Sequence, residues 1–514
     1  MDPIATEHKV ALAEEEMELD QQIGQEAVTT EETRDRRTIN NDNEPVATAG
    51  SQNKDDKAQD EIDPQQQAYR LYVYDLKTEQ QQQQQCQLLS STGTRYNTTV
   101  RKTLENETTL FQQKVDPSLV YDGNNHFRNA KWSPDGCCLL SNSNDNVLRL
   151  FNLPYEMLDE QAETDTITEL ATNFGIREGE TVYDFAWFPS MNSQDPATCC
   201  FITSVRDHPM HMWDACTGNL RASYAVIDHR ERFVGPNVVS FNLDGSRIYC
   251  GYENMIEIFD IQRPGQESQK VPTIPQRRTK KGQKGIISCL DFSPDYAGLY
   301  AAGSYSHTVG IYDETNNELC LKLTDIKTGV TQVKFSPDGS QLFSASRVSN
   351  VISCWDIRNT AEVLYELPRP GQTSQRIVFD IDPSGKMLIT GAQDGSILFH
   401  DISNGPETTA TTENSDSSRL VRSIDHAHQD LTVCATINPM YPWLIASASG
   451  QRKYSAAAGN DDSSDESSDD DDEDDKDDNT QHKDSNSIDN SLKLWRVPGH
   501  SEWYSYPVEQ EEQQ

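Results

Sequence analysis

Alternating apolar and polar positions form three short runs within residues 329–358. The first run, 330–335, precedes a Ser-Pro-Asp-Gly turn at 336–339. In such a turn proline presets φ, aspartate bonds its own backbone and glycine accepts positive φ. The third run closes on Trp355 and Asp356. Three antiparallel strands that end on a Trp-Asp pair are typical of one blade of a WD-repeat β-propeller.

The turn and the closing aromatic residue recur seven times along the chain. The repeats are spaced at or above the roughly 40–45 residues of a WD repeat, and each closes on an aromatic ring followed by a polar side chain. Because one blade cannot bury both of its faces alone, the copies predict an all-β, seven-bladed WD-repeat propeller. The markers of the seven turns are Pro134, Pro189, Leu243, Pro294, Pro337, Pro383 and Pro439.

Composition sets the expected domain boundaries. Residues 1–105 are rich in Glu, Gln, Asp and Thr and poor in aromatic residues, which predicts a disordered N-terminal region. The propeller is expected at 106–506, with a disordered acidic insert at 454–489 inside its last blade. Residues 507–514 form a short C-terminal tail.

Several segments outside the repeats bear on how the ring closes or connect and precede the blades. We expect 109–115 to supply the outermost strand of the last blade, since pairing the chain ends removes an open sheet edge; the alternative is the run 503–506. The alternating run 68–74 is either a strand or a partner-binding peptide. The glutamine run 80–85 is either a tolerated low-complexity tract or a self-association element. Residues 156–174, between the first two blades, are predicted to be helical.

The net charge of −39 is unevenly distributed along the chain. Residues 1–67 hold 18 acidic and 6 basic side chains, and residues 461–478 hold 13 acidic and one basic. These two segments carry most of the excess, so the net charge bears on solubility and long-range attraction and does not exclude a local site for nucleic acid.

Several classes of function lack a basis in the sequence. No apolar run reaches 18 residues, and the N-terminal stretch lacks the basic start and apolar core of a secretion signal. The eleven cysteines form no CxxC pair, which favours reduced core thiols over disulfides or a zinc site. Asp145, Asp207 and Asp394 fall in predicted turns between second and third strands, where we interpret them as hairpin anchors. We therefore expect no catalytic site, no cofactor and no metal.

Five segments together carry a resemblance to a known family. They are NHFRNAKWSPDGCCLLSNSNDNVLRLFNLP (125–154), RDHPMHMWDACTGNLRASY (206–224), GIISCLDFSP (285–294), SRVSNVISCWDIR (346–358) and ASASGQR (446–452). The chain resembles the telomerase Cajal body protein family over roughly residues 120–500, and in that family the last of these segments also precedes an acidic insert.

The resemblance implies a non-enzymatic nuclear RNA-binding scaffold. Its members recognise the CAB box, a short loop motif of small Cajal-body RNAs, and retain H/ACA and C/D guide RNAs with their ribonucleoprotein proteins in Cajal bodies. It further implies contacts with Cajal body scaffold proteins, some protein in the cytoplasm, no membrane association and, in some organisms, telomerase RNA as a client. The residues also admit an alternative, an acidic WD-repeat scaffold for basic nuclear proteins such as histones, which would use 461–478.

Candidate RNA-binding residues come from the loops that gather on one face of a propeller. Connections from the fourth strand to the next blade, and from the second strand to the third, share that face around the channel mouth. A loop RNA needs stacking and edge contacts for its bases and cations for its phosphates. Each residue alone is also compatible with an ordinary loop role, so the hypothesis rests on their convergence. The candidates are a basic cluster, Arg277, Arg278, Lys280, Lys281 and Lys284, and the loop residues Arg206, His208, Tyr305, His307 and Arg347.

The acidic insert contains candidate sites of regulatory phosphorylation. Ser463, Ser467 and Ser468 each have Glu or Asp three residues further on, which suits an acid-directed kinase. Each phosphate would add about −1.5 to −2 charges. The insert is expected to emerge on the face of the basic loop, where it either competes with RNA phosphates or acts as a solvated spacer.

Overall fold

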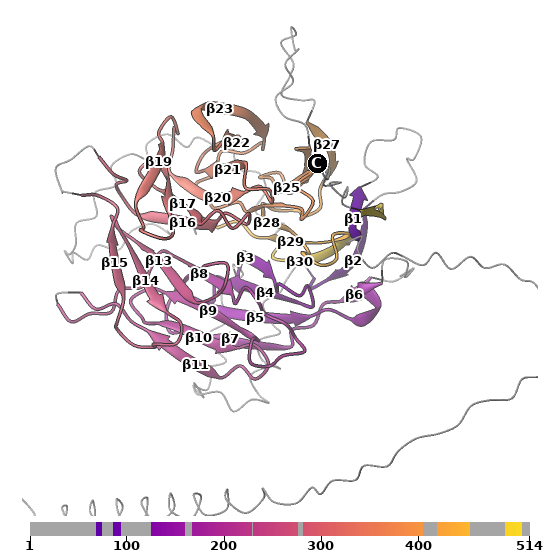
Figure 1. Cartoon of the computed structure of the whole chain (residues 1–514). Helices are drawn as coiled ribbons and strands as arrows, with labels where there is room; N and C mark the ends of the chain where they lie inside the picture. Colours follow the sequence, from indigo (N-terminus) through magenta and orange to yellow (C-terminus); the bar gives the residue numbers. More distant parts are fainter. Residues whose placement is uncertain are drawn as a thin grey trace, which may run out of the picture. The chain divides into compact units, whose positions relative to one another are not determined.

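The computed structural model describes residues 68–74, 86–93, 125–159, 167–228, 230–275, 281–403, 419–452 and 489–505. Within these ranges, the side chains of 68–71, 359–361 and 501–505 are not described. The described strands form eight sheets, of which seven are arranged as the blades of a propeller (Figure 1). The predicted seven-bladed, all-β fold is confirmed.

Six blades are four-stranded antiparallel sheets, and their strands follow one another in chain order from the inside outward. The first three blades contain the following strands. Blade 1 has β3 (Phe127–Trp132), β4 (Cys138–Ser143), β5 (Val147–Asn152) and β7 (Phe174–Arg177). Blade 2 has β8 (Val182–Trp187), β9 (Cys200–Val205), β10 (Met210–Asp214) and β11 (Leu220–Tyr224). Blade 3 has β12 (Val238–Phe241), β13 (Arg247–Tyr252), β14 (Met255–Asp260) and β15 (Gln269–Pro272).

Blades 4 to 6 repeat this arrangement. Blade 4 has β16 (Ile287–Phe292), β17 (Leu299–Ser304), β18 (Thr308–Asp313) and β19 (Leu319–Leu323). Blade 5 has β20 (Val330–Phe335), β21 (Gln341–Ser346), β22 (Val351–Asp356) and β23 (Asn359–Pro368). Blade 6 has β24 (Phe379–Ile381), β25 (Met387–Gly391), β26 (Ile397–Asp401) and β27 (Leu420–Ile424).

The seventh blade closes the ring with strands from both ends of the chain. Its inner strands are β28 (Thr432–Ile437), β29 (Leu444–Ser449) and β30 (Leu492–Arg496), and the N-terminal β2 (Gln87–Ser91) pairs antiparallel with β30. The two-residue β6 (Thr168–Glu169) then pairs in parallel with β2.

The predicted closing segment was therefore wrong. β2 occupies the outermost long-strand position that we expected 109–115 to fill, and 109–115 itself lies outside the described residues. β2 competes well for that position because Leu89 is buried against the last blade and Thr92 exchanges backbone and side-chain hydrogen bonds with Leu492. Two further expectations need correction. Part of 1–105 belongs to the fold, and the described part of 156–174 contains no α-helix but the 3₁₀ turn η1 (Tyr155–Leu158), β6 and the first residue of β7.

A two-stranded ribbon lies against the seventh blade. β1 (Ala68–Tyr74) pairs antiparallel with β31 (Gly499–Ser505), so the run 68–74 is a strand, and the rival closing run 503–506 contributes to this ribbon. Tyr72 donates to the carbonyl of Val497 (2.9 Å) and Tyr74 to that of Pro442 (3.2 Å). The segment that contains the glutamine run therefore connects two strands that are both held at blade 7.

Seven separate hydrophobic cores hold the blades together, one at each junction. Between blades 1 and 2, Leu148 packs with Phe185 and Phe201; at the closing junction, Val433 of blade 7 packs with Phe127 of blade 1. Burying such side chains contributes about 1.5–3 kcal/mol each. Because the last core joins the first and last blades, the ring has no open hydrophobic edge.

The residues that define the repeat pattern stabilise the turns and strands of each blade. In the turn of blade 5, Gly339 has φ +68°, and a Cβ there would lie 2.4 Å from Cγ of Asp295 in the next turn. The closing Trp355 donates its indole N–H to Ser344 (2.9 Å) on the neighbouring strand. Turn geometry and this indole hydrogen bond explain why the repeats keep a glycine turn and an aromatic end.

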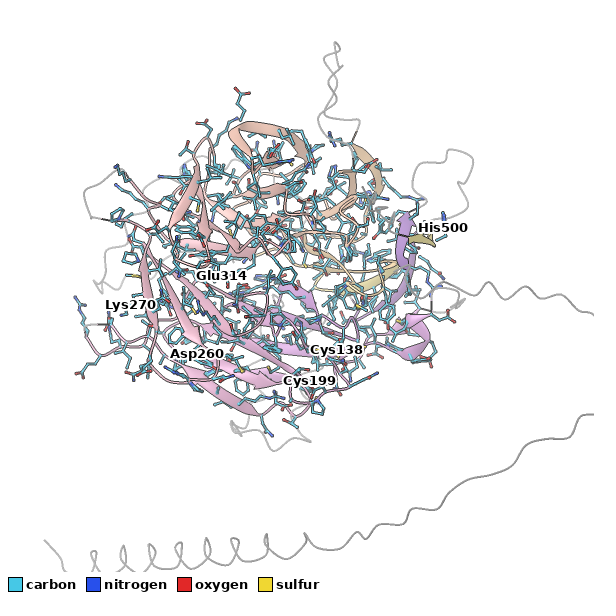
Figure 2. The ribbon with its side chains drawn as sticks, in the orientation of Figure 1. Cys138, Cys199, Asp260, Lys270, Glu314 and His500 are labelled. Carbon is cyan, nitrogen blue, oxygen red and sulfur yellow. The ribbon has the colours of Figure 1, made fainter. Side chains whose placement is uncertain are left out.

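All eleven cysteines are free thiols, but the expectation that they belong to the core is wrong for Cys216 and Cys320, which are exposed. Cys138 and Cys199 both pack at the junction of blades 1 and 2, where burial raises the pKa of each thiol to about 12 (Figure 2). A thiol with such a pKa is almost entirely protonated near neutral pH and therefore a poor nucleophile. In the described part of the chain, no helix is both long and apolar enough to cross a bilayer, and no group of three or more metal-ligating side chains gathers.

Candidate nucleic-acid interface at the channel mouth

The inner strands surround a channel whose wall is cross-linked by carboxylates. Asp184 Oδ2 accepts the backbone N–H of Val239 (3.4 Å), and its Oδ1 pairs with Lys131 (3.0 Å). Two other blades repeat this contact. Asp291 accepts the backbone N–H of Phe335 (2.7 Å), and Asp380 accepts that of Ile437 (2.9 Å). Lys334 pairs with Asp380. These bonds fix one inner strand against the next, so the acidic groups of the channel are occupied.

One end of the channel opens into a pocket of about 450 Å³. It lies on the face where second strands turn into third strands and where each blade leads into the next. Its described lining contains four arginines and a single carboxylate, that of Asp184. In a chain of net charge −39, this is a local concentration of positive charge. The arginines are Arg128, Arg347, Arg376 and Arg452, and the exposed or half-buried aromatic residues are Tyr183 and Tyr305.

Arg347 and Tyr305, both sequence candidates, meet at this mouth. Arg347 follows β21 and Tyr305 follows β17, so they occupy equivalent turns of neighbouring blades. The guanidinium carbon of Arg347 lies 4.0 Å from the centre of the Tyr305 ring. A planar cation stacked on an aromatic ring presents a flat surface on which an unpaired base can stack.

The turn that carries Arg347 is strained. Val348 has φ +49°, a conformation that a β-branched side chain rarely adopts, and half of its surface is exposed. Two hydrogen bonds hold the turn in place, one from the Val348 amide to Thr373 (3.0 Å) and one from Thr328 to the Arg347 carbonyl (2.5 Å). Positive φ recurs between the second and third strands of blades 1 to 4, so the conformation belongs to the repeated hairpin, and Val348 is unusual only in being β-branched. The other residues are Asn146, Asp207, Asn254 and His307.

Arg128 and Tyr183 form the opposite side of the mouth. Arg128 in β3 donates to Asn144 Oδ1 (2.8 Å), and this hydrogen bond fixes the position of the Arg128 guanidinium. Burial raises the pKa of the Tyr183 phenol, and the positive charges of Arg206 and Arg128 partly offset this. Arg206 therefore lies close to the mouth, although it is outside the lining and forms an ion pair with Asp207 (3.3 Å).

Arg452 marks the point where the acidic insert leaves the propeller. The Arg452 amide donates to Gln375 Oε1 (3.1 Å), and Gln375 Nε2 donates to the Gly450 carbonyl (2.8 Å). On the other side of the insert, buried Asp489 accepts from the Gln429 amide (2.8 Å) and from Ser491 (2.6 Å). Both ends of the segment 453–488, which is outside the described residues, are thus held by hydrogen bonds, and one of them, Arg452, lines the mouth pocket.

The remaining sequence candidates are not part of the pocket. Lys281 and Lys284 are exposed on the connection into blade 4, and His307 is exposed in the turn after β17. The ring of His208 bonds the Arg206 carbonyl (2.7 Å) within its own turn. The other candidates lie outside the described residues: Arg277, Arg278, Lys280, Ser463, Ser467 and Ser468.

Buried His428, Asp489 and Ser491 could be mistaken for a hydrolase triad. His428 contacts Ser491 (3.0 Å) and Ser447 (2.7 Å), and Trp495 donates to the same Ser447 (2.8 Å). All of these groups are almost fully buried, and burial lowers the pKa of His428. The set therefore anchors the hairpin of blade 7, as Asp145 does by accepting from Val147 in blade 1.

Sequence reasoning missed Arg128, Arg376, Arg452 and Tyr183 as site residues. Arg452 could have been found, since it follows a second strand just as Arg347 does. Arg128 and Tyr183 lie within first strands, and Arg376 lies just before one. Nothing in their spacing shows which way they face until the ring brings the blades together.

Comparison with known families agrees with the repeat pattern. The family model described as WD domain, G-beta repeat matches residues 117–152, 275–313 and 318–356. These segments correspond to blades 1, 4 and 5.

Similar proteins come from animals and from a yeast. Telomerase Cajal body protein 1 of Mus musculus is 37% identical over 331 residues, covering 64% of this chain and 60% of the mouse protein. The Homo sapiens protein of the same name is 35% identical over 330 residues, covering 64% and 58%. Guanine nucleotide-binding protein negative regulator 1 of Schizosaccharomyces pombe is 32% identical over 299 residues, covering 57% and 74%. The chain thus spans less than two thirds of the length of the Cajal body relatives.

Proposed function

The chain belongs to the WD-repeat family that contains telomerase Cajal body protein 1, and we propose that it is a nuclear RNA-binding scaffold. In this proposal the channel mouth holds the unpaired CAB-box loop of small Cajal-body RNAs. The protein acts without catalysis and gathers H/ACA and C/D guide ribonucleoproteins, and telomerase RNA where it is a client, with scaffold proteins of Cajal bodies.

The observation that carries the proposal is the clustering of four arginines and two tyrosines around one pocket. Guanidinium groups bind phosphates and base edges, and aromatic rings stack on unpaired bases. The one carboxylate of the described lining, Asp184, pairs with Lys131, and the Arg347 guanidinium is stacked on Tyr305, so a polyanion would meet the arginines with little competition from acidic groups of the pocket. A polyanionic ligand with flat, unstacked bases fits this chemistry.

The basic loop would extend the interface beyond the pocket. We place Arg277, Arg278, Lys280, Lys281 and Lys284 along the path of the RNA backbone, as phosphate contacts that add affinity without sequence preference. Arg206, His208 and His307 then lie at the periphery of the interface.

Binding of a CAB-box hairpin to the full chain, measured by fluorescence anisotropy across a salt titration, tests the proposal. Replacing Arg347 and Arg376 by Gln should cost about 1–3 kcal/mol for each hydrogen-bonded base edge that the variant no longer reaches. The salt slope should fall by about 0.7 for each phosphate that is no longer neutralised. Arg358→Gln is the matched control, because Arg358 is 81% exposed in its side chain on the opposite face and pairs with Asp356 (3.6 Å).

Equal affinities of the parent and the double variant, with unchanged melting temperatures, would contradict the proposal. The same titration with a basic histone-tail peptide decides the alternative. Tight peptide binding without RNA binding would favour the acidic scaffold.

A further inference from the structure

Two thiols of blade 2 meet on the face opposite the mouth. Cys199 directly precedes β9, and its carbonyl accepts the backbone N–H of Ala215 (2.9 Å), so the chain that leaves β10 runs beside it. Cys216 is the next residue of that chain and lies in the turn from β10 to β11. The Cys199 sulfur is in hydrogen-bonding contact with the Cys216 thiol. The fold therefore places two cysteines from different turns side by side.

The two thiols differ in their exposure to solvent. Cys199 is 1% exposed and packs in the core between blades 1 and 2, where its thiol donates to the carbonyls of Asn192 (3.1 Å) and Asp195 (3.4 Å). Cys216 is exposed, and its amide donates to Asp214 Oδ1 (2.8 Å), which fixes the turn that presents its thiol. An accessible thiol beside a second cysteine that can resolve it is typical of redox-sensitive sites.

We propose that Cys216 and Cys199 form a reversible dithiol site, which hydroperoxides oxidise to a disulfide. The inference does not depend on RNA binding, because the pair lies on the face away from the mouth. Exposed Cys216 reacts first. Its sulfur attacks one peroxide oxygen, the O–O bond breaks, and the thiol proton passes to the departing oxygen, which leaves as water or an alcohol. Cys216 is then a sulfenic acid.

Cys199 completes the oxidation in a second step. Its sulfur attacks the sulfur of the sulfenic acid, so the S–S bond forms as the S–O bond breaks. The Cys199 proton leaves with the hydroxyl group as water, and the two thiols have together given two electrons to the peroxide. Burial raises the pKa of Cys199 to about 12, so this thiol does not compete for the peroxide itself. It resolves the sulfenic acid because contact makes the reaction intramolecular.

Cys320 provides a comparison within the same chain. All eleven cysteines lie in the part of the chain that the structure describes, and only Cys216 and Cys320 are exposed. Cys320 is in β19 of blade 4, and among the described residues its thiol hydrogen-bonds only the carbonyl of Glu318 (3.7 Å). Peroxide should therefore oxidise Cys320 without linking it to a second cysteine.

Peptide mapping of the full chain tests the inference. The reduced protein is treated with limiting hydrogen peroxide, remaining thiols are blocked with N-ethylmaleimide, and the chain is digested with trypsin without reductant. Cleavage after Arg177, Arg206 and Arg221 places Cys199 and Cys216 on separate peptides, 178–206 and 207–221. We expect these two peptides to be joined by a disulfide that dithiothreitol reverses, and the Cys320 peptide to remain unlinked.

Three serine variants assign the sulfurs. Cys199→Ser and Cys216→Ser should each abolish the link. Cys200→Ser is the matched control, because Cys200 lies on the same peptide but packs in the core between blades 2 and 3, and this variant should keep the link. Since Cys199 is buried, fragmentation of the linked peptides from the parent protein assigns the sulfur if Cys199→Ser does not fold.

Three results would overturn the inference. The first is oxidation of Cys216 to a sulfinic acid with no link to Cys199. The second is a link from Cys216 to Cys138, whose thiol also lies nearby, or a link that survives in Cys199→Ser. The third is a link that forms as readily at Cys320 as at Cys216, which would make the oxidation a matter of exposure alone.

Discussion

The two faces of the propeller use their polar side chains differently. The face opposite the mouth carries the turns from first to second strands and from third to fourth strands. Aspartates there accept hydrogen bonds from the backbone beside them. Asp214, for example, accepts from the amides of Cys216 and Thr217, both at 2.8 Å, and pairs with Arg221 (2.7 Å). At the mouth, Arg376 Nε and Asn142 Oδ1 have no partner among the described residues. Carboxylates fix turn geometry on both faces, as Asp145 and Asp489 do at the mouth, but only the mouth pocket gathers four arginines in its described lining.

Preventing ring closure should have the largest effect on stability, because the loops of both faces depend on a closed ring. Removing residues 1–66 should leave the melting temperature unchanged, since β1 and β2 remain. Removing 1–94 deletes both strands, exposes the edge of β30 and abolishes the burial of Leu89 and Tyr72, at a cost on the order of 5 kcal/mol. Thermal unfolding followed by circular dichroism compares the two truncated chains. Equal melting temperatures would show that another segment closes the ring.

Anchoring aspartates on the two faces should differ in their contribution to stability. Asp489→Ala removes the acceptor for Gln429 and Ser491 in a fully buried position, so it should cost about 3 kcal/mol or more. Asp338→Ala, in an exposed turn, should cost about 1 kcal/mol. Urea unfolding of the full chain measures both free energies. A larger cost for Asp338→Ala would reverse the order that burial predicts.

A buried carboxyl group in the channel wall, that of Asp291, should make stability depend on pH. Burial raises the pKa of Asp291 to about 6, which the neighbouring Lys334 only partly offsets. A carboxyl whose pKa is raised by folding contributes stability below its unfolded pKa of about 4, and this is lost as pH rises through about 6.

Asp291→Asn removes the cost of ionising this group. The variant should be more stable than the parent at pH 8, by up to about 3 kcal/mol, and close to it at pH 4. Melting temperatures between pH 4 and pH 8 check the sign. A variant that is less stable at pH 8 would show that the Lys334 attraction outweighs desolvation.

The smallest effect concerns the acidic insert, which we propose competes with RNA phosphates at the mouth. Its two ends are fixed at Arg452 and Asp489, so a deletion must stop before Asp489. Removing 454–487 should raise RNA affinity a few-fold at low salt, and phosphorylation of Ser463, Ser467 and Ser468 should lower it. The difference should fade near 1 M salt, where the Debye length is about 3 Å. Equal affinities at every salt concentration would make the insert a spacer.

Sequence reasoning was strongest where the determinants are local. Turn residues such as Gly339 and closing residues such as Trp355 act within one hairpin, so their spacing predicted seven blades. Arg347 and Tyr305 were found because equivalent turns of adjacent blades must lie side by side. These inferences needed only the repeat.

Sequence reasoning was weakest where segments that are far apart in the chain meet. β2 contains only two leucines in a glutamine-rich stretch, and its fit depends on β30, some 400 residues away. Asn142 and Arg376 read as ordinary residues until the ring brings their blades around one pocket. Such sites arise from closure, and the repeat pattern alone does not contain them.

Photocrosslinking tests the central claim, that RNA binds the mouth face, most directly. The full chain is irradiated with a CAB-box RNA, and crosslinked peptides are identified by mass spectrometry. Tyr155 and Tyr296, 83% and 82% exposed on the opposite face, are better exposed than Tyr183 at 40%, which makes them stringent internal controls. We predict crosslinks at Tyr183 and Tyr305. Crosslinks at Tyr155 or Tyr296 in their place would contradict the account.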